Sequence, residues 1–132
     1  MPFPVEEKYI IETENKLGVR FPEAFRERLR RQNGGELVVG NEVWIVHPVF
    51  DSSDRKRVGR TANHILRETE AAREWPGFPS GAIAVAENGT GDRLVFLSDT
   101  LGQTALGSTV YHWEHEGGTL EPVAQDFAEL AS

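Results

Sequence analysis

The 132-residue chain contains no cysteine, which excludes a disulfide scaffold, a thiolate zinc site and a cysteine nucleophile. It also lacks any apolar run near the roughly 20 residues that a membrane-spanning helix needs. Residues 1–8 carry neither the basic region nor the apolar stretch of a secretion signal. We therefore expect a cytoplasmic protein, and at this length a single domain around one hydrophobic core.

Positive charge is nearly absent from the second half of the chain. Residues 1–73 carry 13 Lys and Arg against 12 Asp and Glu, whereas residues 74–132 carry only Arg93 against nine acidic residues. An acidic segment repels the phosphates of nucleic acid, so we expect no direct nucleic-acid ligand. The same charge would attract a basic protein partner and raise its encounter rate. Simple solubility is the alternative interpretation.

Apolar residues at helical spacing predict two helices near the N-terminus. The first covers residues 5–17 and ends at Gly18, and the second opens at Phe21-Pro22 and ends at residues 33–35. The second helix carries a run of arginines that alternates with glutamates, namely Arg26, Arg28, Arg30 and Arg31 with Glu23 and Glu27. We interpret this run as a solvated helix face and not as a nucleic-acid patch.

The rest of the chain reads as strands around one more helix. Strands are expected over residues 37–39, 43–46, 82–86, 94–97, 110–116 and 120–123. Residues 51–57 read as a polar connector, residues 58–75 as a helix, and residues 126–130 as a short final helix. The sum is an α+β domain with a mostly antiparallel sheet, an N-terminal helix pair, a central helix and a short C-terminal helix. The residues expected in the core are Phe25, Leu29, Ile65, Leu66, Ile83, Val85, Leu94 and Phe96.

The four histidines of the chain are candidate metal ligands. His112 and His115 lie three positions apart, and an odd separation on a strand points two side chains to opposite faces. His112, Glu114 and Glu116 would share a face and could form a weak site, which makes a metal-dependent hydrolase a remote alternative. We favour a solvated sheet face for these three residues and expect neither a metal nor a cofactor.

Motifs of catalysis are missing from the sequence. The loop over residues 87–92 contains Gly-x-Gly but no Lys-Ser/Thr, and it leads into a strand, so we interpret it as a hairpin turn. No serine lies in a Gly-x-Ser-x-Gly elbow. Carboxylate pairs are too common on an acidic chain to indicate a glycosidase. We therefore expect no enzymatic activity and assign no catalytic residue.

Four segments, in order along the chain, resemble those of a known family. The first is Phe21-Pro22 with the aromatic Phe25 three residues later and Asn33-Gly34-Gly35, and the second is the strand and Gly-Asp turn of residues 83–92. The third is the aromatic strand with a His-Glu ending at residues 110–116, and the fourth is the closing segment 126–130. Together they resemble the SUKH superfamily, which includes immunity proteins of bacterial polymorphic toxin systems and fungal cell-wall-assembly regulators. The resemblance implies one SUKH-like domain over residues 1–132.

The resemblance also implies a binding role without catalytic residues. For the bacterial members it implies a cognate toxin, often a nuclease or deaminase, and the acidic charge of this chain suits such a basic partner. We expect the acidic contacts to be Glu87, Asp92, Asp99, Glu114 and Glu116, with Trp44 or Trp113 as an aromatic anchor. Weaker candidates are Glu36, Glu42 and Asp51. The alternative is an intracellular interaction scaffold or regulator of the same superfamily.

Overall fold

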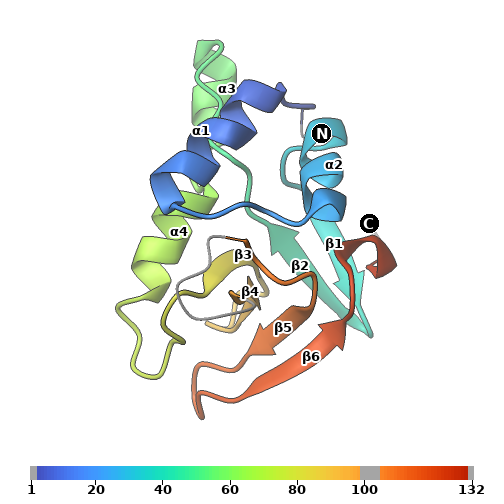
Figure 1. The fold of residues 1–132 in the computed structure, drawn as a ribbon, viewed down its shortest axis with the longest axis vertical. Helices are drawn as coiled ribbons and strands as arrows, with labels where there is room; N and C mark the ends of the chain where they lie inside the picture. Colours follow the sequence, from blue (N-terminus) through green and yellow to red (C-terminus); the bar gives the residue numbers. More distant parts are fainter. Residues whose placement is uncertain (1–2, 99–104, 131–132) are drawn as a thin grey trace.

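The computed structural model describes residues 3–98 and 105–130, which form a six-stranded antiparallel sheet with helices packed against it (Figure 1). The strands lie in the sheet in chain order. They are β1 Glu36–Val39, β2 Glu42–Val46, β3 Ile83–Glu87, β4 Arg93–Phe96, β5 Val110–Trp113 and β6 Leu120–Ala124. The helices are α1 Glu7–Leu17, α2 Glu23–Arg31, α3 Arg55–Arg60, α4 Ile65–Ala72 and the 3-10 turn η1 Phe127–Glu129. The predicted α+β class with an antiparallel sheet is confirmed.

The N-terminal helix pair forms where apolar spacing predicts it. Helix α1 ends because Gly18 adopts the left-handed conformation, with φ at 71°, and its N–H binds carbonyls of the last turn. Helix α2 begins after Pro22, whose φ of −58° suits a helix start and whose missing N–H costs nothing there. The two helices bury Ile10, Phe25 and Leu29 against the sheet. Burial of each such side chain contributes about 1.5–3 kcal/mol.

Alternation along the strands divides the interior between the two faces of the sheet. Leu94 and Phe96 of β4 point into the main core, where Phe96 packs edge-on against Phe25 at 5.4 Å between ring centroids. Val95 and Trp113 point to the opposite face and form a smaller cluster with Ala82, Phe78 and their neighbours. Because both faces are covered here, β4 is buried along its whole length.

The central segment has two helices where the sequence pattern predicts one. Helix α3 begins inside the expected polar connector because the Asp54 side chain accepts a hydrogen bond from the Arg57 backbone N–H at 2.8 Å and so caps the helix. The Thr61 hydroxyl then binds the Arg57 carbonyl at 2.8 Å, and the chain turns before α4 starts. In α4, Ile65 is buried as predicted, whereas Leu66 is only half-buried.

Sheet topology places three hairpin turns at the same end of the sheet. In an antiparallel meander the connections alternate between the two ends, so the β1–β2, β3–β4 and β5–β6 turns share one end. We call residues 40–42, 87–93 and 114–121 the hairpin end. The β2–β3 connection, which carries α3 and α4, and the β4–β5 connection leave the sheet at the other end.

No helix within residues 3–98 and 105–130 is both long enough and apolar enough to cross a membrane.

Two arginines of α2 are buried, so the prediction of a solvated arginine face is wrong for them. The Nε of Arg26 donates to Glu14 of α1 at 3.1 Å, and its Nη2 donates to Glu7. The Nη2 of Arg28 donates to the Gly34 carbonyl at 2.9 Å. These partners come from other segments of the chain, which spacing within α2 cannot reveal. Both arginines therefore join elements of the fold.

Replacing Glu14 with alanine removes the buried acceptor of the Arg26 guanidinium and of the Phe21 backbone N–H, which lies 2.8 Å from the carboxylate. Because the buried guanidinium then loses its one buried carboxylate partner and keeps only the more exposed Glu7 and Glu23, we expect the free energy of unfolding to fall by about 3 kcal/mol. Urea unfolding followed by circular dichroism measures the change.

The matched control is Glu12→Ala on the same helix. The ion pair between Glu12 and Lys16 has side chains that are 52% and 54% exposed, so we expect a change below about 0.5 kcal/mol. Equal, small changes in the two variants would contradict the structural role of Glu14.

Candidate functional site

Acidic side chains gather at the hairpin end. The carboxylates in its three turns are Glu42, Glu87, Asp92, Glu114, Glu116 and Glu121. The basic residue of these segments, Arg93, is buried and donates from Nη1 to the Gly91 carbonyl at 2.8 Å. Within the described part of the chain, no lysine or arginine forms an ion pair with any of the six carboxylates. The hairpin end therefore keeps its negative charge.

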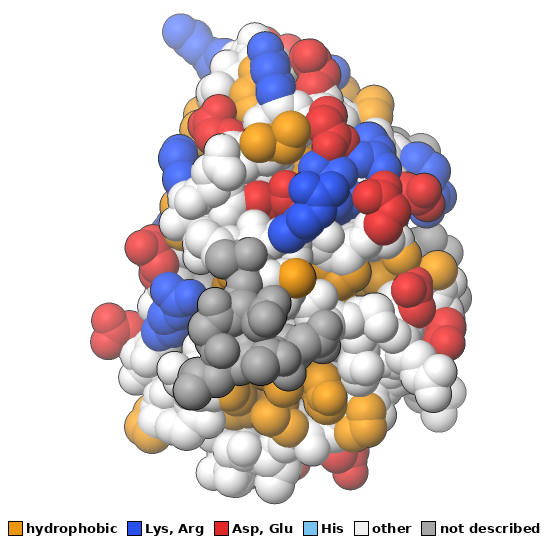
Figure 2. All heavy atoms as spheres, viewed as in Figure 1, with side chains coloured by type: hydrophobic (Ala, Val, Ile, Leu, Met, Phe, Trp, Pro, Cys, Tyr) orange, Lys and Arg blue, Asp and Glu red, His pale blue; other side chains and the backbone are white. Residues whose placement is uncertain are grey.

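The distribution of charge is visible on the surface. In Figure 2 basic side chains lie over the upper and middle parts of this face, where they alternate with acidic ones. The lower part, where β5 and β6 lie in Figure 1, shows mainly uncharged side chains, with acidic ones at its edge and no basic ones among the residues that are coloured. Arginines between α1 and α2 are paired with glutamates of the same two helices. Arg30, for example, binds Glu7 and Glu23.

Asp92 joins two of the hairpin turns. Its Oδ2 lies 2.8 Å from His112 Nε2, and its Oδ1 lies 2.6 Å from His115 Nδ1 and 3.2 Å from the His115 backbone N. Burial acts to raise the pKa of Asp92, but the hydrogen bonds from His112 and His115 outweigh it, and the pKa is lowered. Asp92 is thus an internal acceptor that is only 14% exposed, which leaves little of it for a partner.

Both histidines reach Asp92, contrary to the expectation that they point to opposite faces. Strand β5 ends at Trp113, and the turn that follows brings His115 back to the side of His112. Gly91 makes room for this approach, since a Cβ on it would lie 2.9 Å from the His115 ring. The Gly-x-Gly-Asp sequence was therefore the signal from which this contact could have been predicted. It is a motif for close packing beside a histidine and not a phosphate loop.

Neither tryptophan expected as an anchor lies at the surface. Trp44 is 1% exposed and packs edge-on against His112 at 5.1 Å, and Trp113 is fully buried and donates from Nε1 to the Gly77 carbonyl at 3.3 Å. A partner that docks on the folded surface cannot reach either ring. The exposed tryptophan is Trp75, at 40%, and its ring lies 5.1 Å from the His115 ring.

The segment after α4 places Trp75 at the hairpin end. Figure 1 shows this loop beside the β5–β6 turn, and the two approach closely enough that a Cβ on Gly77 would lie 3.7 Å from Gly118. Sequence reasoning missed this placement because ten residues of irregular chain separate α4 from β3. An exposed aromatic ring thus borders the acidic turns.

The other predicted contact residues differ in how far a partner could reach them. Glu114 and Glu116 are exposed in the β5–β6 turn, where Glu114 also accepts a 3.4 Å hydrogen bond from the Thr119 hydroxyl. Glu87 is half-buried at the end of β3. Asp99 lies outside the described residues.

The weaker candidates differ in the same way. Glu36 is exposed on β1, and Glu42 is exposed and accepts a 3.1 Å hydrogen bond from Asn88 of the neighbouring turn. Asp51 is buried, accepts the Ser53 backbone N–H and lies 3.7 Å from Arg57, so it serves the fold.

The structure does not support the metal site of the hydrolase alternative, which was expected at His112, Glu114 and Glu116. His112 Nε2 is engaged by Asp92, and Glu114 is engaged by Thr119. Within residues 3–98 and 105–130, His112, Glu114 and Glu116 do not bring ligand atoms together, and the group of potential ligands that does form lies elsewhere, at His47.

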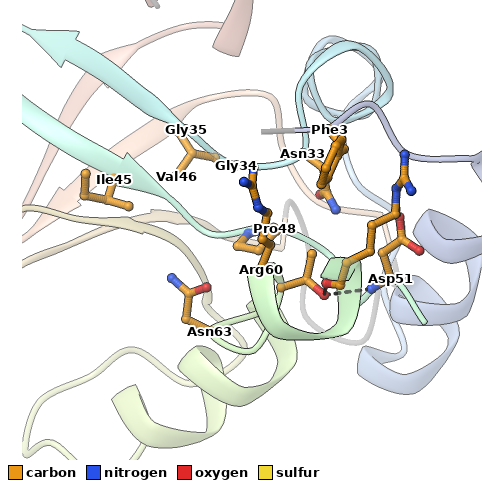
Figure 3. A pocket seen from close by; sticks show the side chains of 12 residues that line it. Phe3, Asn33, Gly34, Gly35, Ile45, Val46, Pro48, Asp51, Arg60 and Asn63 are labelled. Carbon is orange, nitrogen blue, oxygen red and sulfur yellow. Dashed lines mark hydrogen bonds and ion pairs between the residues drawn. The ribbon is translucent and has the colours of Figure 1, made fainter. Parts of the chain in front are cut away.

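A pocket of about 290 Å³ lies between β2, α3 and the N-terminal segment (Figure 3). Its apolar walls include Phe3, Ile45 and Pro48. Asn33 of the pocket exchanges two hydrogen bonds with the Val49 backbone, and Asp51 is held as described above. Asn33 and Asp51 are therefore used to hold the fold together, and the polar residues of the pocket do not include a nucleophile beside a base.

Replacing Asp92 with asparagine tests whether its hydrogen bonds to His112 and His115 stabilise the fold. Because the folded-state pKa lies below the unfolded value of about 3.9, Asp92 stabilises the fold above that value, and the contribution is lost as the pH falls through the folded pKa. We expect Asp92→Asn to lower the free energy of unfolding by about 1–2 kcal/mol at pH 7, with a difference that shrinks below about pH 4. Urea midpoints over a pH series measure this.

Exposed Glu121, changed to glutamine, is the control with the same loss of charge and should leave the pH profile of stability nearly unchanged. An Asp92→Asn profile parallel to that of the wild type down to pH 3 would contradict the assignment.

Comparison with protein families gives one result for the whole chain. The model of the SMI1 / KNR4 family (SUKH-1) matches residues 4–132. A search of curated proteins found no match. The family match spans nearly the full sequence and all six strands, in agreement with the resemblance of the four sequence segments. The chain therefore belongs to the SMI1 / KNR4 family (SUKH-1) of the SUKH superfamily.

Proposed function

We propose that this protein is a non-enzymatic immunity-type protein that binds and neutralises a basic toxin domain, such as a nuclease or deaminase, through the hairpin end. The observation that carries the proposal is that three turns bring together six carboxylates without an arginine or lysine partner in the described residues, and that four of them, Glu42, Glu114, Glu116 and Glu121, are exposed. Family membership fits immunity or regulator roles. The proposal keeps the cytoplasmic location expected from the sequence.

Electrostatics supports a basic partner for this surface. Enzymes that grip nucleic acid present lysine and arginine to its phosphates. A surface with uncompensated carboxylates attracts such a protein over a Debye length of about 8–10 Å and competes with the nucleic acid for the same cations. The exposed residues Glu42, Glu114, Glu116 and Glu121 would make the first contacts.

Trp75 supplies the aromatic anchor in this proposal. Tryptophan is among the residues that most often dominate binding energy, and it does so when a ring of other contacts excludes water from it. Trp75 is held edge-on by His115, which Asp92 fixes in turn. A ring positioned before the partner arrives loses little conformational entropy on binding.

A regulator that binds a less basic protein is the second candidate. It is favoured by an aliphatic patch on β1 and β2, formed by Val38, Val43 and Ile45, which are 44%, 49% and 39% exposed. These side chains share the face opposite to buried Leu37 and Trp44. A partner that uses this patch would bind independently of the acidic turns, which separates the two candidates by experiment.

Reversing two charges in the β5–β6 turn tests the proposed function. We expect Glu114→Lys with Glu116→Lys to weaken binding of a candidate toxin domain, chosen from neighbouring genes by its basic nuclease or deaminase character, by at least about tenfold, mainly through slower association at low salt. Surface plasmon resonance at several salt concentrations measures both rates. Rescue of growth on co-expression with the toxin should fail in parallel.

The control carries the same change of net charge on the helices, as Glu12→Lys with Glu27→Lys, two exposed residues of α1 and α2. This variant should bind the toxin domain like the wild type. If both double variants bind equally well, the acidic hairpin end is not the contact surface. Loss of binding on replacing Val43 with glutamate would then favour the aliphatic patch.

Replacing Trp75 with alanine should weaken the same complex by about 2 kcal/mol or more, mainly through faster dissociation. The variant should keep its unfolding midpoint within a few degrees because Trp75 is 40% exposed. Phe50, a half-buried aromatic that packs on His64 at 5.3 Å, is the control position for the same truncation. Unchanged dissociation in Trp75→Ala would remove Trp75 from the interface.

A further inference from the structure

His47 is a buried polar residue without a partner. It follows β2, where the chain leaves the sheet, and its backbone N–H donates to the Val85 carbonyl at 2.8 Å. Its side chain is 0% exposed, and neither ring nitrogen has a hydrogen-bond partner in the described part of the molecule. An imidazole in this position carries a cost in stability, since both nitrogens lose their water without replacement.

Two glutamates from different elements face this imidazole. Glu68 comes from α4 and Glu87 from the end of β3, and both are half-buried. One oxygen of each carboxylate and one ring nitrogen of His47 all lie within 4.8 Å of one another. Within residues 3–98 and 105–130, neither carboxylate has a hydrogen bond or an ion pair of its own.

We propose that His47, Glu68 and Glu87 bind a divalent first-row transition-metal cation, for which Zn²⁺ is the suitable probe. A single imidazole nitrogen with two carboxylate oxygens is a donor set that such cations accept at 2.0–2.2 Å. The two carboxylates balance the charge of the ion, and water would complete the coordination. Magnesium and calcium are poor matches because they prefer oxygen ligands alone.

The geometry needs only a small contraction to hold an ion. Ligands at 2.0–2.2 Å around a tetrahedral ion lie about 3.3–3.6 Å apart, so separations of up to 4.8 Å must shorten by at most about 1.5 Å. The glutamate side chains have three rotatable bonds each and reach the site from α4 and β3, whereas His47 is fixed by its burial. The histidine is therefore the fixed ligand, and the carboxylates would close on the ion.

Arg93 brings a positive charge close to this arrangement. It pairs with Glu87 across the β3–β4 ladder, yet it forms no ion pair with Glu87 and instead donates from Nη1 to the carbonyls of Gly91 and Asp92. Two carboxylates against one guanidinium leave the site with an excess of negative charge. That balance still favours a cation over an empty group of like charges.

Metal binding would connect α4, β3 and the segment after β2. Helix α4 lies against β3, where the Thr69 hydroxyl accepts a 3.0 Å hydrogen bond from the Ala84 backbone N–H, and the ion would add a second link beside it. A ligand that binds only the folded state raises its stability by mass action. The proposal does not depend on toxin binding, since it would hold in the isolated protein.

Thermal unfolding and calorimetric titration of tag-free, chelator-treated protein with Zn²⁺ test this site. We expect binding of one ion per chain and a melting temperature about 5–10 °C higher at a hundredfold excess over the dissociation constant. Glu68→Gln and Glu87→Gln, which keep the side-chain size, should each weaken Zn²⁺ binding by at least about tenfold. Glu70→Gln, two residues away on the exposed side of α4, should bind like the wild type.

Three results would overturn the proposal. The first is no Zn²⁺ binding by the wild-type protein. The second is full binding by both Glu68→Gln and Glu87→Gln, which would locate the ion elsewhere, for example at His112 and His115. The third is an equal response to Mg²⁺, which would exclude the imidazole as a ligand. The glutamate variants decide the question even if His47→Asn fails to fold.

Discussion

Antiparallel pairing of consecutive strands is the constraint on which the rest of this structure depends. Each connection in such a meander crosses to the other end of the sheet, so the short turns collect at one end and the long connections at the other. The turns are rich in acidic residues, and the β2–β3 connection carries α3 and α4. The separation of an acidic end from a helical, mixed-charge side follows from strand order together with the acidic residues in the turns.

The charged side chains of this fold are of two kinds: some are buried and link elements by hydrogen bonds, and others are exposed at the surface. Arg26 and Arg28 connect α2 to its neighbours, and Asp92 connects two hairpin turns through two histidines. Glu114 and Glu116 have no such role and remain exposed. Like charges that crowd one end of a small protein reduce its stability, so their presence is better explained by a binding role than by folding. This contrast supports the proposed contact with a basic partner.

The two proposals use neighbouring parts of the molecule for different purposes. Partner binding uses the exposed carboxylates and Trp75, whereas the proposed metal site uses His47, which is buried, and two half-buried glutamates. Glu87 belongs to the predicted partner contacts, and in the metal proposal it serves instead as a ligand beside His47. A bound ion would brace the base of the β3–β4 hairpin and leave the outer carboxylates free for a partner.

Sequence alone determined the local elements and the family. Apolar spacing and glycine or proline at the ends predicted α1, α2 and the six strands, because these signals act within a few residues. The charge asymmetry was equally readable. The break between α3 and α4 was missed because its cause, the bonds of Thr61 to Arg57 and Asp51, includes contacts across a turn.

Only the tertiary structure decided which side chains face a partner. Trp44, Trp75 and Trp113 look alike in sequence, and burial between sheet and loops separates the exposed ring from the two inner ones. His47, Glu68 and Glu87 lie 21 and 19 positions apart, so no local pattern joins them. The strand period of two placed His112 and His115 on opposite faces, and the turn after Trp113 reversed that result. Such neighbours are determined by packing between residues far apart in the chain, and rules based on local residue spacing cannot predict them.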